Sequence, residues 1–340
     1  MITQFNLIFL FFFISIQLIL VIFFNKFAVF FGIYDQPDKI RKKHLIKTSL
    51  LGGSIIYLSL IFNNILFVFD PIFFETNNLF FKSSNQYLYF FVSCTFMFLI
   101  GIFDDLVNLN YSLKLFLTFV VILILVSADK SLLINEINLS FYPEMIDSSI
   151  ISIFFTILCF LLFINAINMF DGIDGQVGLY SIFLILFIMH RTGLNVWLLI
   201  FLISFITFIF LNFKRKCFLG DGGTILIGFV FSYLLIKLYN YNIIYFADQI
   251  FLIMIIPGID MLRLFVERIF SNRNPFKGDA NHIHHLFEKN FGKYRSIFFT
   301  QILIILPVVF SIYFNLLMIN FFTIILYFLI ILVLKTYKRT

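Results

Sequence analysis

Residues 150–178 read IISIFFTILCFLLFINAINMFDGIDGQVG, an apolar run that gives way abruptly to a polar, glycine-rich segment. The run over 150–167 is long enough to cross a bilayer as a helix, for which about 20 apolar residues suffice. The polar segment then places two asparagines, two aspartates and three glycines within 15 residues, and a second apolar run begins at 177. The stretch predicts membrane helices whose polar chemistry lies where one helix ends.

The composition of the whole chain fits this pattern. Of the 340 residues, 61% are hydrophobic and only 12% are charged, whereas a soluble domain has about 25% charged residues. We therefore predict an all-α polytopic membrane protein with about 11 transmembrane helices, or 10 as the alternative count, in one domain over 1–340. The expected spans are 5–31, 50–69, 87–103, 113–128, 150–167, 177–190, 195–212, 223–240, 246–264, 296–316 and 321–335.

The basic residues predict the orientation, because cytoplasmic loops carry an excess of Lys and Arg. Loops and flanks after the odd-numbered helices hold 20 of the 24 basic residues, and the remaining four are Lys82, Lys130, Arg191 and Lys237. We expect the amino terminus outside and the carboxyl terminus in the cytoplasm.

Polar motifs follow helices one, three, five, seven and nine, and the topology therefore places all of them on the cytoplasmic side. They read YDQPDKIRKKH, GIFDDLVNLN, NAINMFDGIDGQ, FLGDGGT and NPFKGDANHIHHLF. Ordinary connecting loops would not be expected to concentrate their polar residues on one side. The sequence predicts one composite site at the membrane surface.

Acidic and amide residues in these motifs indicate phosphate and metal chemistry. Asp104 and Asp105 close the third helix, and adjacent helical positions point about 100° apart, so we expect separate roles for them. Asp221 lies in a glycine turn at a helix amino terminus, where backbone N–H groups favour phosphate oxygens. Mg²⁺ typically takes one or two carboxylates plus substrate phosphates. A helix cap is the plainer alternative for Asp221.

The asparagine-aspartate motif suits a nucleotide pocket. Its amide and carboxylate side chains can bind base or sugar edges or complete a metal shell, and its glycines allow backbone to approach a ligand closely. A polar turn at the membrane interface is the alternative, although such a density of polar residues is costly there without a partner.

Three histidines, His282, His284 and His285, follow a stretch that contains Arg263, Arg268, Arg273 and Lys277. No cysteine lies near them, and two of them are adjacent, so a zinc site is disfavoured. We interpret them as donors to anionic oxygens, one of which could move a proton.

The predicted site combines anion donors, a Mg²⁺ ligand set and a nucleotide pocket at a bilayer surface. This combination predicts a transfer reaction between a soluble nucleotide substrate and a lipid phosphate. Phosphoryl transfer mainly requires alignment and charge neutralisation. A lipid monophosphate is already a nucleophile at neutral pH, since its second pKa lies near 6.

These five ordered motifs, over about 32–290, resemble the polyprenyl-phosphate N-acetylhexosamine-1-phosphate transferases, also called glycosyltransferase family 4. The resemblance implies that a UDP-N-acetylhexosamine reacts with undecaprenyl phosphate, releasing UMP, with Mg²⁺ or Mn²⁺ as cofactor. It also implies a multi-pass protein of the bacterial cytoplasmic membrane that binds no nucleic acid. A homodimer is left open.

The resemblance also implies roles for individual residues. Asp104, Asp105, Asp221 and His282 are expected to be catalytic, with Asp221 and Asn168 as metal ligands. The nucleotide-contacting residues are expected to be Asn165, Asp171, Gly172, Ile173 and Asp174. The residues expected to hold the sugar or phosphate are Arg41, Lys42, His44, Arg268, His284 and His285.

The HIHH form of the last motif resembles amino-sugar transferases of O-antigen, enterobacterial common antigen and teichoic acid pathways. N-acetylglucosamine, N-acetylgalactosamine, N-acetylquinovosamine and N-acetylfucosamine stay open as sugars, and phospho-N-acetylmuramoyl-pentapeptide transfer is the alternative within the family. A transporter or a non-catalytic scaffold is the alternative of another class. The CDP-alcohol phosphotransferases are disfavoured, because DGIDGQVG lacks their alanine-arginine pair.

Overall fold

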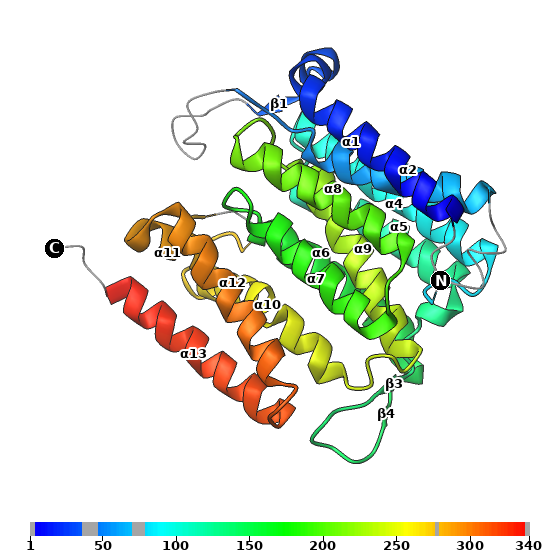
Figure 1. Ribbon diagram of the computed structural model, residues 1–340. Helices are drawn as coiled ribbons and strands as arrows, with labels where there is room; N and C mark the ends of the chain where they lie inside the picture. The colour runs from blue at the N-terminus through cyan, green and yellow to red at the C-terminus, as the bar shows by residue number, and fades with distance from the viewer. Residues whose placement is uncertain (1–3, 36–46, 70–78, 276–278, 337–340) are drawn as a thin grey trace. The chain divides into compact units, whose positions relative to one another are not determined.

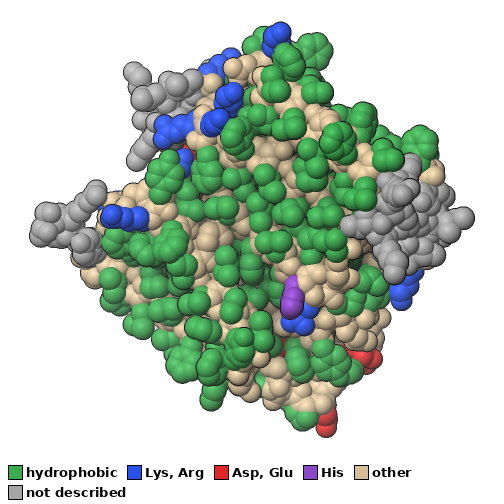
Figure 2. All heavy atoms as spheres, in the orientation of Figure 1, with side chains coloured by type: hydrophobic (Ala, Val, Ile, Leu, Met, Phe, Trp, Pro, Cys, Tyr) green, Lys and Arg blue, Asp and Glu red, His purple; other side chains and the backbone are tan. Residues whose placement is uncertain are grey.

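The computed structural model describes residues 4–35, 47–69, 79–275 and 279–336, which are predominantly helical (Figure 1). Within these ranges ten helices of at least 18 residues are apolar enough to cross a membrane, and one further apolar helix, α7 (Gln176–Thr192), has 17 residues. Hydrophobic side chains cover most of the surface drawn in Figure 2. The predicted all-α polytopic membrane protein is confirmed, while the orientation of its termini stays a prediction.

The chain divides into two compact units, which are described separately. The first comprises Met1–Asp129 and Val177–Val230, and the second Lys130–Gln176 and Phe231–Thr340. Helix α9 (Gly220–Asn240) contributes its first half to unit 1 and its second half to unit 2. The single transferase domain expected over the whole chain stays a prediction.

Unit 1 is built around helices α2 and α8. Helix α8 packs against α1 and α2, and α4 packs against α2 and α5. Polar side chains begin several helices, since Ser83, Asn110 and Asn195 accept backbone N–H groups of α4, α5 and α8, as N-cap residues do. The other elements are α1 (Gln4–Phe31), β1 (Tyr34–Asp35), β2 (Thr48–Ser49), α2 (Gly52–Phe69), α4 (Ser84–Val107), α5 (Tyr111–Ala128), α7 and α8 (Val196–Phe213).

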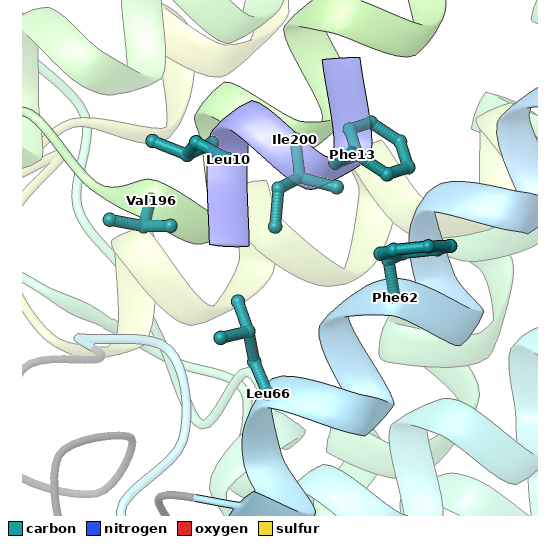
Figure 3. Packing of buried hydrophobic residues seen from close by; sticks show 6 residues of the cluster. All are labelled: Leu10, Phe13, Phe62, Leu66, Val196 and Ile200. Atoms are coloured by element: carbon teal, nitrogen blue, oxygen red, sulfur yellow. The ribbon is translucent and has the colours of Figure 1, made fainter. Parts of the chain in front are cut away.

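Aromatic and aliphatic packing joins α1, α2 and α8 (Figure 3). The ring centroids of Phe13 and Phe62 are 4.7 Å apart, and Leu10, Leu66 and Ile200 complete the contact. Lipid is as apolar as these side chains, so close packing and not the removal of water holds such helices together.

Unit 2 is built around α10 (Ala247–Phe270), which packs against α6, α12 and α13. A short hairpin of β3 and β4, which the sequence did not predict, precedes α6. Asp248 at the start of α10 accepts the backbone N–H and the hydroxyl of Ser140 from this hairpin. The other elements are η1 (Lys130–Leu132), β3 (Glu136–Ile137), β4 (Ile146–Asp147), η2 (Ser149–Ile151), α6 (Ser152–Phe170), α11 (Ile283–Phe291), α12 (Lys293–Phe310) and α13 (Leu316–Thr336).

Several helix boundaries differ from the prediction. Helix α4 continues to Val107, α6 to Phe170 and α10 to Phe270, and α9 begins at Gly220, so motif residues expected in loops lie in terminal helical turns. The span predicted over 296–316 was too long, because α12 ends at Phe310 and Asn315 accepts the Leu317 backbone N–H at the start of α13. Ile312, Tyr313 and Phe314 continue the apolar pattern through this turn and concealed it.

Candidate active site

In unit 1 the polar residues of three helices meet in an acidic cluster of Asp104, Asp105, Lys114 and Asp221. The Lys114 ammonium lies 2.5 Å from Asp104 Oδ2 and 3.2 Å from Asp221 Oδ1. Asp104 also accepts the Leu109 backbone N–H through Oδ1, at 2.8 Å. The end of α4, the first turn of α5 and the first turn of α9 thus bring three carboxylates and one cation together.

Asp105 holds the amino terminus of α9 in place. Its two carboxylate oxygens accept the backbone N–H groups of Asp221 at 2.8 Å and of Gly222 at 3.1 Å. These N–H groups lack partners inside their own helix, so a neighbouring helix supplies the cap. Asp104 and Asp105 therefore have different partners although they are adjacent.

Gly220 is required for this cap on two grounds. Its φ of +72° lies in the left-handed region that favours glycine, and a Cβ there would lie 2.6 Å from Asp105 Oδ2. The glycine turn in FLGDGGT thus lets a carboxylate approach the start of α9 and orients Asp221.

The sequence did not identify Lys114 as a site residue, and it entered only the count of basic residues that predicts the orientation of the helices. It lies ten residues after Asp104, in the next helix, and no local motif connects the two. Its position shows that a cation between Asp104 and Asp221 is compatible with their geometry.

The carboxylates of the acidic cluster fit the divalent ion implied by the resemblance. Asp104 and Asp221 each direct one oxygen to the same cationic group, and Mg²⁺ is bound through one or two carboxylates together with substrate phosphates. Among the residues described, no three His, Cys, Asp or Glu side chains converge on one point, so substrate oxygens would have to complete the coordination shell.

Residues 50–53, which read LLGG and follow the first motif, pack directly against the FLGDGGT motif. The backbone N–H groups of Gly52 and Gly53 donate to the carbonyls of Phe218 and Leu219, each at 2.9 Å, and the Phe218 N–H donates to Ser49. The segment that follows the first motif is therefore joined to the fourth motif by backbone hydrogen bonds. Arg41, Lys42 and His44, expected to bind sugar or phosphate, lie outside the described residues.

In unit 2 the asparagine-aspartate motif forms the end of α6 and the turn after it. Asn165 and Asn168 lie in the last turns of the helix, where the Asn165 amide donates to the Leu161 carbonyl at 2.7 Å. Asp171 follows the helix, and Asp174 is ion-paired with Lys293 of α12.

Two further members of this motif differ in exposure. Ile173 is buried, so a nucleotide would meet its backbone and not its side chain. Gly172 is exposed. The pairing of Asn168 with Asp221 on one metal stays a prediction.

The three histidines lie at and after the start of α11, a helix that the sequence did not predict. The rings of His282 and His284 stack at 5.3 Å with a 7° interplanar angle, and His285 lies 4.4 Å from His284. A Cβ at Gly172 would lie 2.1 Å from His284 Nε2 and 2.8 Å from His285 Nε2. The nucleotide motif and the histidine motif of unit 2 are therefore in direct contact, and Gly172 permits their close approach.

His284 is fully buried, and neither ring nitrogen has a hydrogen-bond partner among the described residues. Burial lowers the pKa of His284 well below its usual value, and the neighbouring His285 and His282 lower it further. The ring is thus neutral near pH 7, and its expected contact with sugar or phosphate stays a prediction.

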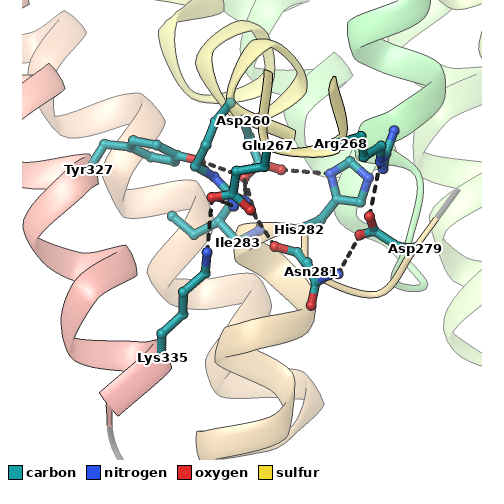
Figure 4. Close-up of polar contacts among 10 residues, drawn as sticks. Asp260, Glu267, Arg268, Asp279, Asn281, His282, Ile283, Tyr327 and Lys335 are labelled. Atoms are coloured by element: carbon teal, nitrogen blue, oxygen red, sulfur yellow. Dashed lines mark hydrogen bonds and ion pairs between the residues drawn. The ribbon is translucent and has the colours of Figure 1, made fainter. Parts of the chain in front are cut away.

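His282 is largely buried, and its ring lies next to Asp260 (Figure 4). Its Nδ1 lies 2.7 Å from Oδ2 of Asp260, in α10. Arg263 donates to Asp260 and to Glu267, which also accepts from Lys335 of α13. Asp260 was not predicted as a site residue, because an aspartate within a predicted apolar span, outside any motif, gives no pattern that identifies its partners.

Arg268 is buried beside the histidines. Its Nε donates to Asp279 Oδ2 at 3.0 Å and its Nη1 to the Pro275 carbonyl, while Nη2 has no partner among the described residues. Burial raises the pKa of Asp279, but the hydrogen bonds from Arg268 and from the Asn281 N–H outweigh it and hold the pKa below its usual value. Among the described residues, the guanidinium therefore keeps the Nη2 donor without a partner, beside the ionised Asp279.

Fold and geometry together define a helical multi-pass membrane protein with polar clusters at helix ends. Residues 87–239 match glycosyl transferase family 4. This match confirms the resemblance that the motifs indicated, and the matched segment includes all of the acidic cluster and the asparagine-aspartate motif.

Curated relatives carry the same class of name. The chain is 32% identical over 109 residues to undecaprenyl-phosphate alpha-N-acetylglucosaminyl 1-phosphate transferase from Salmonella typhi, and 30% identical over 109 residues to the protein of that name from Escherichia coli K12. The Haemophilus influenzae protein of that name is 30% identical over 113 residues. Each alignment covers 29–30% of this chain and 30–31% of the relative.

Proposed function

We propose that this protein transfers a sugar 1-phosphate from a UDP-N-acetylhexosamine to undecaprenyl phosphate, with release of UMP. The observation that carries the proposal is the convergence of Asp104, Lys114 and Asp221 beneath the capped start of α9. The names of the relatives support N-acetylglucosamine as the sugar. Assembly of a lipid-linked glycan, such as O-antigen or lipopolysaccharide, at the inner membrane would follow.

The residues of the acidic cluster would bring two anionic phosphates together. Asp221 and Asp104 would hold Mg²⁺, or Mn²⁺ in its place, which supplies charge neutralisation at the transferred phosphate. Asp105 orients Asp221 through the α9 backbone. Lys114 would remain beside the carboxylates and limit their repulsion of the incoming lipid phosphate.

In unit 2, the proposal assigns nucleotide contacts to Asp171, Gly172 and Asp174. Arg268 would donate to a phosphate oxygen through Nη2, for which the described part of the chain offers no other partner. Phosphate recognition by a guanidinium is favoured by charge and by its planar fork of donors. Lys293 would have to leave Asp174 for that carboxylate to accept a ribose hydroxyl. A homodimer is compatible with this assignment and is not required by it.

The test uses purified protein in detergent with Mg²⁺ and undecaprenyl phosphate. UDP-N-acetylglucosamine, UDP-N-acetylgalactosamine, UDP-N-acetylquinovosamine, UDP-N-acetylfucosamine and UDP-N-acetylmuramoyl-pentapeptide are offered separately, and UMP release is measured. Release with a simple amino sugar supports the proposal and identifies the substrate. UMP release with the muramoyl-pentapeptide substrate alone would assign the protein to peptidoglycan synthesis. Absence of UMP release with all five substrates would contradict the transferase proposal and favour transport.

A further inference from the structure

The two carboxylate oxygens of Asp260 have different hydrogen-bond partners. Oδ1 accepts the Tyr327 hydroxyl at 2.7 Å, Arg263 Nη2 at 2.8 Å and the Ile283 backbone N–H at 3.1 Å. Oδ2 lies 2.7 Å from His282 Nδ1. The contacts that hold the carboxylate in place thus all fall on one oxygen, and the other is presented to the imidazole (Figure 4).

The network does not need His282 to balance its charge. Arg263 pairs with Asp260 and Glu267, and Lys335 pairs with Glu267, so two acids already meet two bases. Asp260 is only 1% exposed, and a buried carboxylate is costly unless it is paired and hydrogen-bonded. Arg263, Tyr327 and a backbone N–H already stabilise the buried carboxylate. The fold therefore does not require the bond to His282.

A carboxylate beside Nδ1 determines how an imidazole can act. It can only accept, so it keeps a proton on Nδ1 and fixes the tautomer and the orientation of the ring. Nε2 is then the nitrogen left to meet a substrate. The stacked ring of His284 restrains His282 from one face.

The last transmembrane helix supports this arrangement. Tyr327 of α13 donates to Asp260 and accepts from Arg263 Nε at 2.7 Å, and both of its bonds are buried. Helix α13 lies outside the segment that matches the family. Asp260, Arg263 and His282 lie outside this segment as well, so the family match contains none of the residues of this network.

We propose that Asp260, held by Arg263 and Tyr327, is a positioning residue for His282, which keeps the proton on Nδ1 and presents Nε2 to the sugar diphosphate. The inference rests on the proposed function for the identity of the substrate. Asp260 itself contacts no substrate and acts through the histidine.

A double-mutant cycle tests whether Asp260 acts through His282. Asp260→Asn keeps the size of the side chain but offers an NH₂ that can donate to Nδ1, so the tautomer is no longer fixed. We expect Asp260→Asn to lower kcat for UMP release at least about 10-fold, with KM for the UDP-sugar changed by less than about threefold. In the His282→Asn background the same substitution should cause no further loss, whereas multiplied losses would overturn the proposal.

Asp248→Asn is the matched control for this cycle. Asp248 is a buried carboxylate of the same helix, but it binds Ser140 of the β3–β4 hairpin. Any loss that Asp248→Asn causes should multiply with that of His282→Asn. Tyr327→Phe should reduce kcat in the same direction as Asp260→Asn, by a smaller factor.

A second measurement does not depend on turnover. In ¹⁵N-histidine-labelled protein without substrate, His282, assigned through His282→Asn, should show a protonated Nδ1, and Asp260→Asn should redistribute that proton. An unchanged His282 signal in Asp260→Asn would overturn the proposal. An inactive protein with the expected signals would instead contradict the proposed function and leave the positioning intact.

Discussion

At the scale of single residues, the acidic cluster combines rigid and adjustable parts. Asp104 is nearly buried and bound by Lys114 and a backbone N–H, whereas the Asp221 side chain is 31% exposed. The buried carboxylate is therefore fixed before substrate binds, and the exposed one is accessible to a ligand. This difference makes Asp221 the better candidate for direct contact with metal and phosphate.

Asp221→Asn should lower the rate of UMP release by at least about 100-fold, the order of loss seen when one electrostatic group aimed at a reacting charge is removed. The loss should persist at every Mg²⁺ concentration. Asp147→Asn is the control, because Asp147 is an exposed hairpin carboxylate, and its activity should match that of the unaltered protein. Recovery of Asp221→Asn at high Mg²⁺ would instead give this residue a weaker, supporting role.

The buried His284 predicts a pH dependence of stability. Its pKa is lowered in the folded state by burial, so below about pH 6.5 the unfolded chain binds a proton that the folded protein resists. Stability from this residue is complete above the unfolded pKa and is lost as the pH falls below it. The Tm in detergent should therefore decrease from pH 7.5 to pH 5.5.

His284→Gln should reduce this decrease in Tm, whatever it does to the Tm at pH 7.5. His190→Gln alters an exposed histidine at the end of α7 and should leave the pH dependence as it is. An equal pH dependence in the unaltered protein and in His284→Gln would contradict the role assigned to burial.

At the scale of helices, the crossing of α4 and α9 brings two backbones unusually close. A Cβ at Gly101 would lie 2.4 Å from the Asp221 carbonyl oxygen, whereas a Cβ at Gly222 would first meet the Ile102 side chain, at 3.1 Å. Backbone cannot yield as a side chain can, so the two glycines of this crossing are not equivalent.

Gly101→Ala should therefore destabilise the protein by about 1–3 kcal/mol, as overpacking typically does, and lower its Tm in detergent. Gly222→Ala should cost much less, since alanine favours a helix by up to about 1 kcal/mol over glycine and Ile102 can adjust. Equal losses of Tm in the two variants would show that the crossing relaxes more freely than its geometry indicates.

The sequence predicted the helices well where apolar length alone decides, and less well where a turn is apolar or a helix is polar. Helix α11 was missed because its nine residues include two histidines and follow a polar stretch. Asp104, Asp221 and His282 were predicted as site residues because motifs surround them. Lys114, Asp260 and Tyr327 were not, because their importance arises from contacts between helices that are distant in sequence.

At the scale of the whole molecule, the distribution of Lys and Arg predicts which ends of the helices face the cytoplasm. Within unit 2, Ile150 lies in η2, directly before α6, and is 97% exposed. The exposed Arg295 lies in the first turn of α12. These two residues give unit 2 one position for chemical labelling near the β3–β4 hairpin and one near the histidines.

Single cysteines at these positions, in a chain whose Cys94, Cys159 and Cys217 are replaced by alanine, should react differently with a membrane-impermeant maleimide. Ile150→Cys should be labelled in intact cells, and Arg295→Cys only after the membrane is permeabilised. Because both lie in unit 2, the reverse pattern would invert the proposed orientation and place the histidines outside, away from cytoplasmic UDP-sugars.

Because Asp105 caps α9, the backbone amides of Asp221 and Gly222 can report on the contact between α4 and α9. Their hydrogens are bound to a carboxylate of another helix, so their exchange with deuterated water should be slow only while α4 and α9 remain together. Amides in the first turn of a helix would otherwise exchange quickly, because their own helix offers them no acceptor. Deuterium uptake at these two positions would thus report whether a purified sample is intact before any substrate is added.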